Sequence, residues 1–273
     1  GYALKRYLKY VLQYDRRNFL QIFGERWIEK TEKYINDLTE FKYQGYWLAD
    51  IRDLKGIDRF KYYYKRARRL ILNKFLPDNY KIIDCHNYIP KLITRHPIQN
   101  REKFIKYTQE YCQEMFDSKN KENKQFNLID QLVSPINTEK YLEYVKKLKV
   151  IIVDRDPRDV YIECCEKNDH VLPKDIEEFC KVYIDSRKYK TSNSNVMYIY
   201  FEDLIYNFEM SKSKIEKFLN LDSKAHQEKG IYYSIEKSKI NTRLWKKYPK
   251  YDKEVKYIEN KLEKYLYKIE ENN

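Results

Sequence analysis

Residues 149–161 read KVIIVDRDPRDVY, and this stretch decides the fold that we expect. Its first part, 149–154, is a short run of branched apolar residues, which is typical of a buried strand. Pro157 then opens a helix over 157–167, because proline's fixed φ suits the first helical position and its missing N–H costs nothing there. The stretch therefore predicts a strand, a turn and a helix in direct succession.

Three more runs read as buried strands, and segments with helical periodicity alternate with them. The predicted strands are 80–85 (YKIIDC), 126–132 (FNLIDQL), 149–154 and 196–201 (VMYIYF). The predicted helices are 2–14, 25–39, 60–76, 101–118, 138–148, 157–167, 174–189, 208–219 and 252–268. Strands that alternate with helices pair in parallel through βαβ crossovers. The expected fold class is therefore α/β, a helix-rich chain with a parallel β-sheet that helices cover on both faces.

The composition suits one globular domain over 1–273, since 42% of the residues are hydrophobic. No apolar run approaches the roughly 18 to 20 residues that cross a bilayer, so we expect no integral membrane segment. The first residues carry lysines but no cleavage site of small residues, so we expect no signal peptide. The five cysteines contain no CxxC and the four histidines show no ligand spacing, which indicates a reducing compartment and no metal site.

The net charge of +13 favours an anionic partner, which is a nucleic acid, a phosphorylated cofactor, an acidic glycan or a membrane surface. Residues 60–69 (FKYYYKRARR) mix basic and aromatic side chains, as nucleic-acid-binding surfaces do. On a helix, however, this spacing predicts that Phe60, Tyr63 and Tyr64 face the core while the basic residues stay in solvent. The sequence therefore disfavours a nucleic acid as the partner.

Two arginines, Arg155 and Arg158, flank the start of the helix that follows strand 149–154. In an open parallel sheet, ligands bind beyond the carboxyl ends of the strands, where helix N-termini present free N–H groups. Arginines beside such a turn complete a phosphate pocket through bidentate contacts. Alternatively, Asp156 and Asp159 cap the helix while the two arginines pair with them on the surface. The residues alone leave both interpretations open.

Four segments in order resemble the sulfotransferases that use 3′-phosphoadenosine 5′-phosphosulfate. The run 149–161 resembles their 3′-phosphate-binding motif, and 82–90 (IIDCHNYIP) resembles the strand that ends in a Lys-Thr-His-type triplet. Residues 198–204 (YIYFEDL) resemble the strand and turn near the adenine, and 239–248 (KINTRLWKKY) resemble the C-terminal loop that closes over the cofactor. The resemblance covers residues 80 to 268 and implies a P-loop NTPase-like sulfotransferase fold.

The resemblance implies transfer of a sulfuryl group from 3′-phosphoadenosine 5′-phosphosulfate to a hydroxyl or amine acceptor, without a metal. Such a transfer needs cations for the phosphates and one base for the acceptor proton. His86 is the expected base, although Asp84 and Cys85 replace the usual Lys-Thr before it. Asp130 is the alternative base, because other branches of the family use an acid. The expected contacts to the nucleotide are Arg155, Phe201, Lys239, Arg243, Trp245 and Lys246.

Three features depart from the family pattern. Glu163 stands where the family has a serine that contacts the 3′-phosphate, so this carboxylate either points away or marks a changed pocket. Ile240 and Arg243 occupy positions where the family favours glycines. No loop like Lys-Ser-Gly-Thr, which holds the 5′-phosphosulfate, occurs in the chain. We expect this loop and its strand to precede residue 1, or else the chain is a degenerate homologue.

The acceptor is expected to contact helical insertions at 16–79 and 96–125, the segments least like the family motifs. Few glycines and many lysines, tyrosines, isoleucines and asparagines suggest an AT-rich genome. These observations favour a bacterial cytoplasmic enzyme that acts on a surface-glycan precursor. The alternative function is a basic, non-catalytic protein that binds nucleic acid or glycan on a degenerate sulfotransferase fold.

Overall fold

The computed structural model describes residue 6 and residues 16–45, 54–82, 92–117, 126–130, 133–167, 171–225, 231 and 233–268. The chain divides into two compact units, Gly1–Asn127 and Leu128–Asn273. The expectation of one sulfotransferase-like domain over 1–273 stays a prediction. Within the described ranges, no helix combines the length and the apolar character that crossing a membrane requires.

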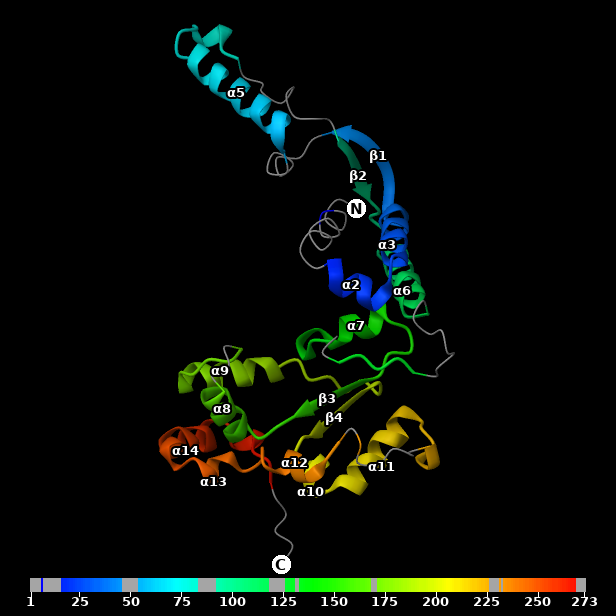
Figure 1. The fold of residues 1–273 in the computed structure, drawn as a ribbon, viewed down its shortest axis with the longest axis vertical. Coiled ribbons are helices and arrows are strands. Elements are labelled where there is room, and N and C mark those ends of the chain that lie inside the picture. Colours follow the sequence, from blue (N-terminus) through cyan, green and yellow to red (C-terminus); the bar gives the residue numbers. More distant parts are fainter. Residues whose placement is uncertain are drawn as a thin grey trace, which may run out of the picture. The chain divides into compact units, whose positions relative to one another are not determined.

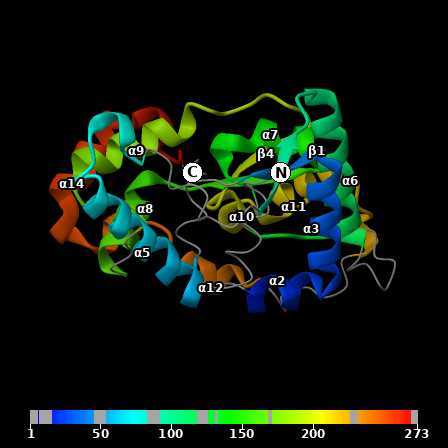
Figure 2. The same cartoon turned by 90° about the horizontal axis from the view of Figure 1, so that it is seen from above.

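The first unit combines helices with one antiparallel pair of strands. Its elements are α2 (Arg16–Phe23), α3 (Arg26–Asp37), β1 (Thr39–Gly45), α5 (Gly56–Leu72), a 3-10 turn (Asp78–Tyr80), β2 (Leu92–Pro97) and α6 (Arg101–Asp117). Strands β1 and β2 pair antiparallel, with Phe41 opposite His96. Helices α3 and α6 lie side by side in both views (Figures 1 and 2). Trp27, Ile35 and Met115 form the buried cluster between them.

The second unit carries the parallel strands. Its elements are a 3-10 turn (Pro135–Asn137), α7 (Thr138–Tyr144), β3 (Val150–Asp154), α8 (Pro157–Glu166), α9 (Ile176–Arg187), β4 (Val196–Tyr200), α10 (Asp203–Tyr206), α11 (Phe208–Leu219), α12 (Ile235–Lys239), α13 (Leu244–Lys247) and α14 (Asp252–Lys261), with further 3-10 turns at Ser223–Ala225, Pro249–Tyr251 and Glu263–Tyr265. Strands β3 and β4 pair in parallel, with Val150 opposite Val196. Helices α8, α9 and α14 group beyond the carboxyl end of β3 (Figure 1). Ile162, Phe179 and Ile258 are fully buried between these helices.

The structure confirms the parallel pairing of 149–154 with 196–201 and most of the predicted helices. Helix α11 has the predicted bounds, and α3, α5, α6, α7, α8 and α9 differ from their predicted ends by four residues or fewer. Helix α14 ends at Lys261, seven residues before its predicted end, and the sequence did not predict α2, α10, α12 and α13. The predicted helix 2–14 lies outside the described residues except for residue 6. Local signals explain this agreement. Asp175 caps α9 by accepting a hydrogen bond from the Glu178 N–H at 2.9 Å, and Asn220 ends α11 in the left-handed conformation. The chain is helix-rich and contains a small parallel sheet, which is consistent with the α/β class.

Two predicted strands do not appear in the residues that the structure describes. Residues 126–130 form no strand, and Leu128 is 99% exposed. The apolar side chains of this segment are exposed, so no packing against another element stabilises a strand there. Within the predicted strand 80–85, Tyr80 ends a 3-10 turn and 83–85 lie outside the described residues. The sheet is also less covered than expected, because Val153 in β3 is 54% exposed.

The buried residue of α5 lies on the side opposite to the face that we predicted to be buried. Tyr62 is its buried residue, whereas Phe60, Tyr63 and Tyr64 are 66%, 47% and 58% exposed. The prediction that these three rings face a core is therefore wrong. Periodicity identifies the apolar face of a helix, but it does not show whether another element covers that face.

Candidate functional site

The turn between β3 and α8 begins the candidate site. Pro157 occupies the first position of α8, and Asp156 caps the helix by accepting a hydrogen bond from the Arg158 N–H at 2.9 Å. The Tyr183 hydroxyl donates to the Arg155 carbonyl at 2.7 Å, which ties the turn to α9. The local motif thus fixes the direction in which α8 leaves the sheet.

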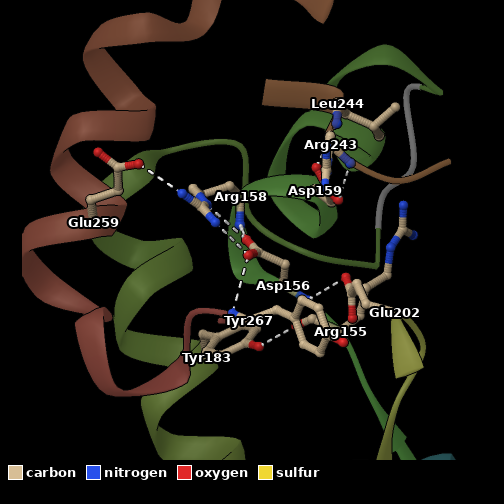
Figure 3. Close-up of polar contacts among 10 residues, drawn as sticks. All are labelled: Arg155, Asp156, Arg158, Asp159, Tyr183, Glu202, Arg243, Leu244, Glu259 and Tyr267. Carbon is tan, nitrogen blue, oxygen red and sulfur yellow. Dashed lines mark hydrogen bonds and ion pairs between the residues drawn. The ribbon is translucent and has the colours of Figure 1, made fainter. Parts of the chain in front are cut away.

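Arg158 forms a buried ion pair with Asp156. Its guanidinium donates to both Asp156 carboxylate oxygens, at 3.0 and 2.7 Å, and to Glu259 of α14 at 2.8 Å (Figure 3). Asp156 also accepts the Tyr267 N–H at 3.2 Å. Because Arg158 is 8% and Asp156 3% exposed, the pairing expected on the surface lies in the interior instead. Arg158 therefore holds α8 against the C-terminal segment rather than facing a ligand.

Asp159 caps another segment of the chain, not its own helix. Its carboxylate accepts the N–H groups of Arg243 at 2.8 Å and Leu244 at 2.7 Å, so it anchors the C-terminal loop (239–248) to α8 (Figure 3). Arg243 has a φ of +53°, a left-handed conformation that favours glycine. The two hydrogen bonds offset the strain that a side chain adds there. Burial and the charge of Asp156 raise the pKa of Asp159 above its usual value.

Arg155 is held by three partners. Its guanidinium pairs with Glu163 and donates to the Asn241 carbonyl at 2.6 Å, and it lies 5.2 Å from the centre of the Phe201 ring. Glu163 also pairs with Lys167. Burial acts to raise the pKa of Glu163, but the hydrogen bonds and charges of Lys167 and Arg155 outweigh it and lower this pKa below its usual value. Glu163 therefore points toward Arg155, and the pocket around this arginine already contains a carboxylate.

Glu202 is a buried acid directly beside this turn. One carboxylate oxygen accepts the Asp156 N–H at 3.0 Å, and the other has no hydrogen-bond partner in the described part of the protein. The residue is 2% exposed. Burial, together with repulsion from Asp156 and Asp159, raises the pKa of Glu202 to about 7. The folded chain therefore holds a proton here at pH values at which an ordinary glutamate has lost it.

This proton predicts a pH dependence of stability. Since the folded pKa lies above the ordinary value of 4.5, Glu202 favours folding most below about pH 4.5, and that contribution is lost as the pH rises to 7. The free energy of unfolding falls by up to about 1.4 kcal/mol per pH unit in this window. We expect Glu202→Gln to flatten the slope in urea unfolding measured across the window. Exposed Glu209→Gln is the control, and an unchanged slope in Glu202→Gln would contradict the assignment.

The other three predicted nucleotide contacts, Trp245, Lys246 and Lys239, differ in how far they are buried. The Trp245 ring packs beneath the Arg158 guanidinium at 4.3 Å and joins the core of α8, α9 and α14, not the sheet. The Lys246 ammonium lies 5.0 Å from the same ring and is exposed. Lys239 is exposed at the end of α12. The structure thus joins the strand end to the C-terminal loop but leaves both lysines in solvent.

Of the two candidate bases, the structure describes one. His86 lies outside the described residues, as do Asp84 and Cys85. Asp130 is described and is exposed in a bend. The assignment of the base therefore stays a prediction.

A small hollow of about 110 Å³ opens beside β3. The cations Arg187 and Lys190 both contact the Asp154 carboxylate there and lower its pKa, although burial opposes them. None of the predicted nucleotide contacts lines this hollow, whose walls are Pro135, Ile152, Val153, Asp154, Ser186, Arg187, Tyr189, Lys190 and Tyr198. Two cations face one carboxylate there, so the hollow keeps one positive charge in excess.

Sequence reasoning missed the roles of Asp159, Glu202 and Tyr183. Asp159 lies in the motif, but its partners follow 84 and 85 positions later, and no local pattern links them. Glu202 belongs to the predicted YIYFEDL segment, where a glutamate directly after an apolar strand was the available signal.

No group of three or more histidine, cysteine or acidic side chains in the described ranges is arranged to hold a metal ion.

Comparisons with known proteins identify no relative of this chain. No family model matches the chain. Searches of curated proteins and of solved structures give no significant match either. The function must therefore be argued from the residues of the site itself.

Proposed function

We propose that this chain transfers a sulfuryl group from 3′-phosphoadenosine 5′-phosphosulfate to a hydroxyl or amine of an acceptor, such as a surface-glycan precursor. In this transfer the acceptor oxygen or nitrogen bonds to sulfur, the bond from sulfur to the phosphate oxygen breaks, and a base takes the acceptor proton. The remaining nucleotide leaves as 3′-phosphoadenosine 5′-phosphate. The protein must supply cations for the phosphates and hold the reactants in line.

One observation carries this proposal. The Nε atoms of Arg155 and Arg243 are both buried and lack a hydrogen-bond partner in the described residues, as do those of Arg95 and Arg187. Arg155 and Arg243 differ from the other two because they come from the two segments that Asp159 and Asn241 bring together at the carboxyl end of β3. A buried donor without a partner costs about 1 to 3 kcal/mol. A phosphate between the two guanidinium groups would satisfy both donors, and this supports a nucleotide site here.

Glu163 sets a condition on this role. Its carboxylate now neutralises Arg155, so a 3′-phosphate must displace Glu163 from the guanidinium. Lys167 also contacts Glu163 and lies four residues further along the chain, directly after α8, where it stays paired with the displaced carboxylate. We infer that Glu163 weakens phosphate binding, because the 3′-phosphate of the nucleotide has to replace the Glu163 carboxylate as the anionic partner of Arg155.

Titration with nucleotides tests this function. We expect tighter binding of 3′-phosphoadenosine 5′-phosphate than of 5′-AMP by calorimetry, because only the former carries the phosphate that Arg155 contacts. Arg155→Ala should remove this preference, a loss of about 1.5 to 3 kcal/mol for a charge-assisted contact. Glu163→Gln should tighten binding of the 3′-phosphate by about tenfold or more. Glu166→Gln, on the same helix and paired with Lys250, is the matched control and should change nothing.

Equal affinity for the two nucleotides would remove the support for this cofactor. The Arg155–Glu163 pair specifically favours a second candidate, a non-catalytic protein that binds an anionic glycan on a degenerate sulfotransferase fold. In that case Glu163→Gln would increase binding of a sulfated oligosaccharide but not of the nucleotide. The same set of variants therefore distinguishes the two functions.

A further inference from the structure

Helix α5 exposes a continuous apolar stripe. Ile57, Phe60, Tyr64 and Ile71 follow one another at spacings of three, four and seven residues, which places them on one face of the helix. They are 64%, 66%, 58% and 58% exposed. Phe75, one turn beyond Ile71 along the chain, is 82% exposed. Tyr62, the buried residue of the helix, lies on the opposite face.

Exposed basic side chains border the apolar face of α5. At 100° per residue, Lys61 and Arg68 lie directly beside the stripe on one side. On the other side Tyr63 and Leu70, 47% and 52% exposed, extend the apolar face, and Arg59 and Arg66 lie beyond them. Asp58 is the one acidic residue of the helix. A helix with an apolar face and basic flanks matches an interface in which hydrocarbon lies beneath a layer of negative charge.

We propose that α5 docks onto an anionic lipid surface, with the helix lying in the plane of the interface and its apolar stripe in the acyl boundary. Charge decides against a second copy of this chain, since two such helices would bring their arginines together. Aliphatic Ile57 and Ile71 decide against a nucleic acid, which offers phosphates and stacking bases but no hydrocarbon layer. This inference is independent of the proposed nucleotide site.

Flotation of the full chain with vesicles tests the proposal. We expect binding to vesicles of phosphatidylcholine mixed with phosphatidylglycerol, weaker binding to pure phosphatidylcholine, and loss of the difference at high salt. Phe60→Ser combined with Ile71→Ser should lower binding to the anionic vesicles by about tenfold or more, because two exposed apolar side chains no longer enter the acyl region. The matched control, Leu128→Ser with Met210→Ser, removes two apolar side chains elsewhere that are 99% and 54% exposed, and it should leave binding unchanged.

A second pair of variants tests the basic side chains of α5 against a control that changes the net charge by the same amount. Arg66→Glu with Arg68→Glu should lower binding by about tenfold or more, since each basic residue near an anionic surface contributes about fivefold. Lys253→Glu with Lys256→Glu, exposed on α14, changes the net charge equally and should have a smaller effect.

Several results would overturn the proposal. One is the absence of vesicle binding, and another is an equal loss in the variants of α5 and in their controls, which would indicate general adsorption of a basic protein. Binding to single-stranded RNA that Phe60→Ser with Ile71→Ser abolishes would assign the face to nucleic acid. A dimer in light scattering that the same variant dissociates would assign it to a second copy.

Discussion

Replacing Arg158 with methionine is expected to lower the free energy of unfolding by about 3 to 5 kcal/mol. The substitution keeps much of the apolar stem but leaves the Asp156 carboxylate buried without its counter-ion. It also removes the contact to Glu259 that joins α8 to α14, and the stacking of the guanidinium on Trp245. Urea unfolding of the full chain measures the change.

Two further variants separate the buried charge from the loss of contacts. Asp156→Asn with Arg158→Met keeps an oxygen that caps α8 but removes the uncompensated charge, so it should recover about half of the loss. Lys188→Met breaks an exposed pair with Asp185 and should cost less than about 1 kcal/mol. A loss of that small size in Arg158→Met would show that the buried pair contributes little to the fold.

Replacing His86 with alanine is expected to lower sulfuryl transfer by about a hundredfold or more, since loss of a general base typically costs 10²–10⁴. This prediction rests on the proposed function. Nucleotide affinity should stay nearly unchanged, because the expected phosphate contacts come from Arg155 and the C-terminal loop. A transfer assay with a panel of glycans, with nucleotide titration beside it, measures both quantities.

His96→Ala is the matched control, because His96 lies on β2 near Glu40 and should not affect transfer. Asp130→Asn tests the alternative base. Unchanged turnover in His86→Ala together with a large loss in Asp130→Asn would move the base role to the carboxylate. If neither variant lowers turnover, the base is a different group.

The elements of the second unit follow from signals that act over a few residues. The apolar run before Arg155 predicts β3, Pro157 predicts the start of α8, and the similar run over 196–201 predicts β4 beside it. Propensity, capping and proline's fixed φ depend only on neighbouring positions, so they can be read from the sequence. Right-handed crossovers then leave little choice about how β3 and β4 pair.

The antiparallel pair β1–β2 shows where local signals are too weak. Its segments, TEFKYQG and LITRHP, mix charged and apolar residues and lie 46 residues apart. Their ladder forms because each strand supplies the other's backbone partners, and neither segment predicts that pairing by itself. Residues 126–130 show the opposite case, a segment that we predicted to be a strand and that is not one. Its side chains are exposed, so no packing stabilises a strand there.

By itself, the sequence determined most of the helices and the strands β3 and β4, and it placed Arg155 and Arg158 at the end of a strand. The tertiary structure decided what those arginines do: it placed Arg158 in a buried pair, set Glu163 against Arg155 and joined Asp159 to Arg243. It also turned the apolar stripe of α5 outward. The physical reason is that periodicity describes one element, whereas burial and charge pairing depend on which distant segments the whole chain brings into contact.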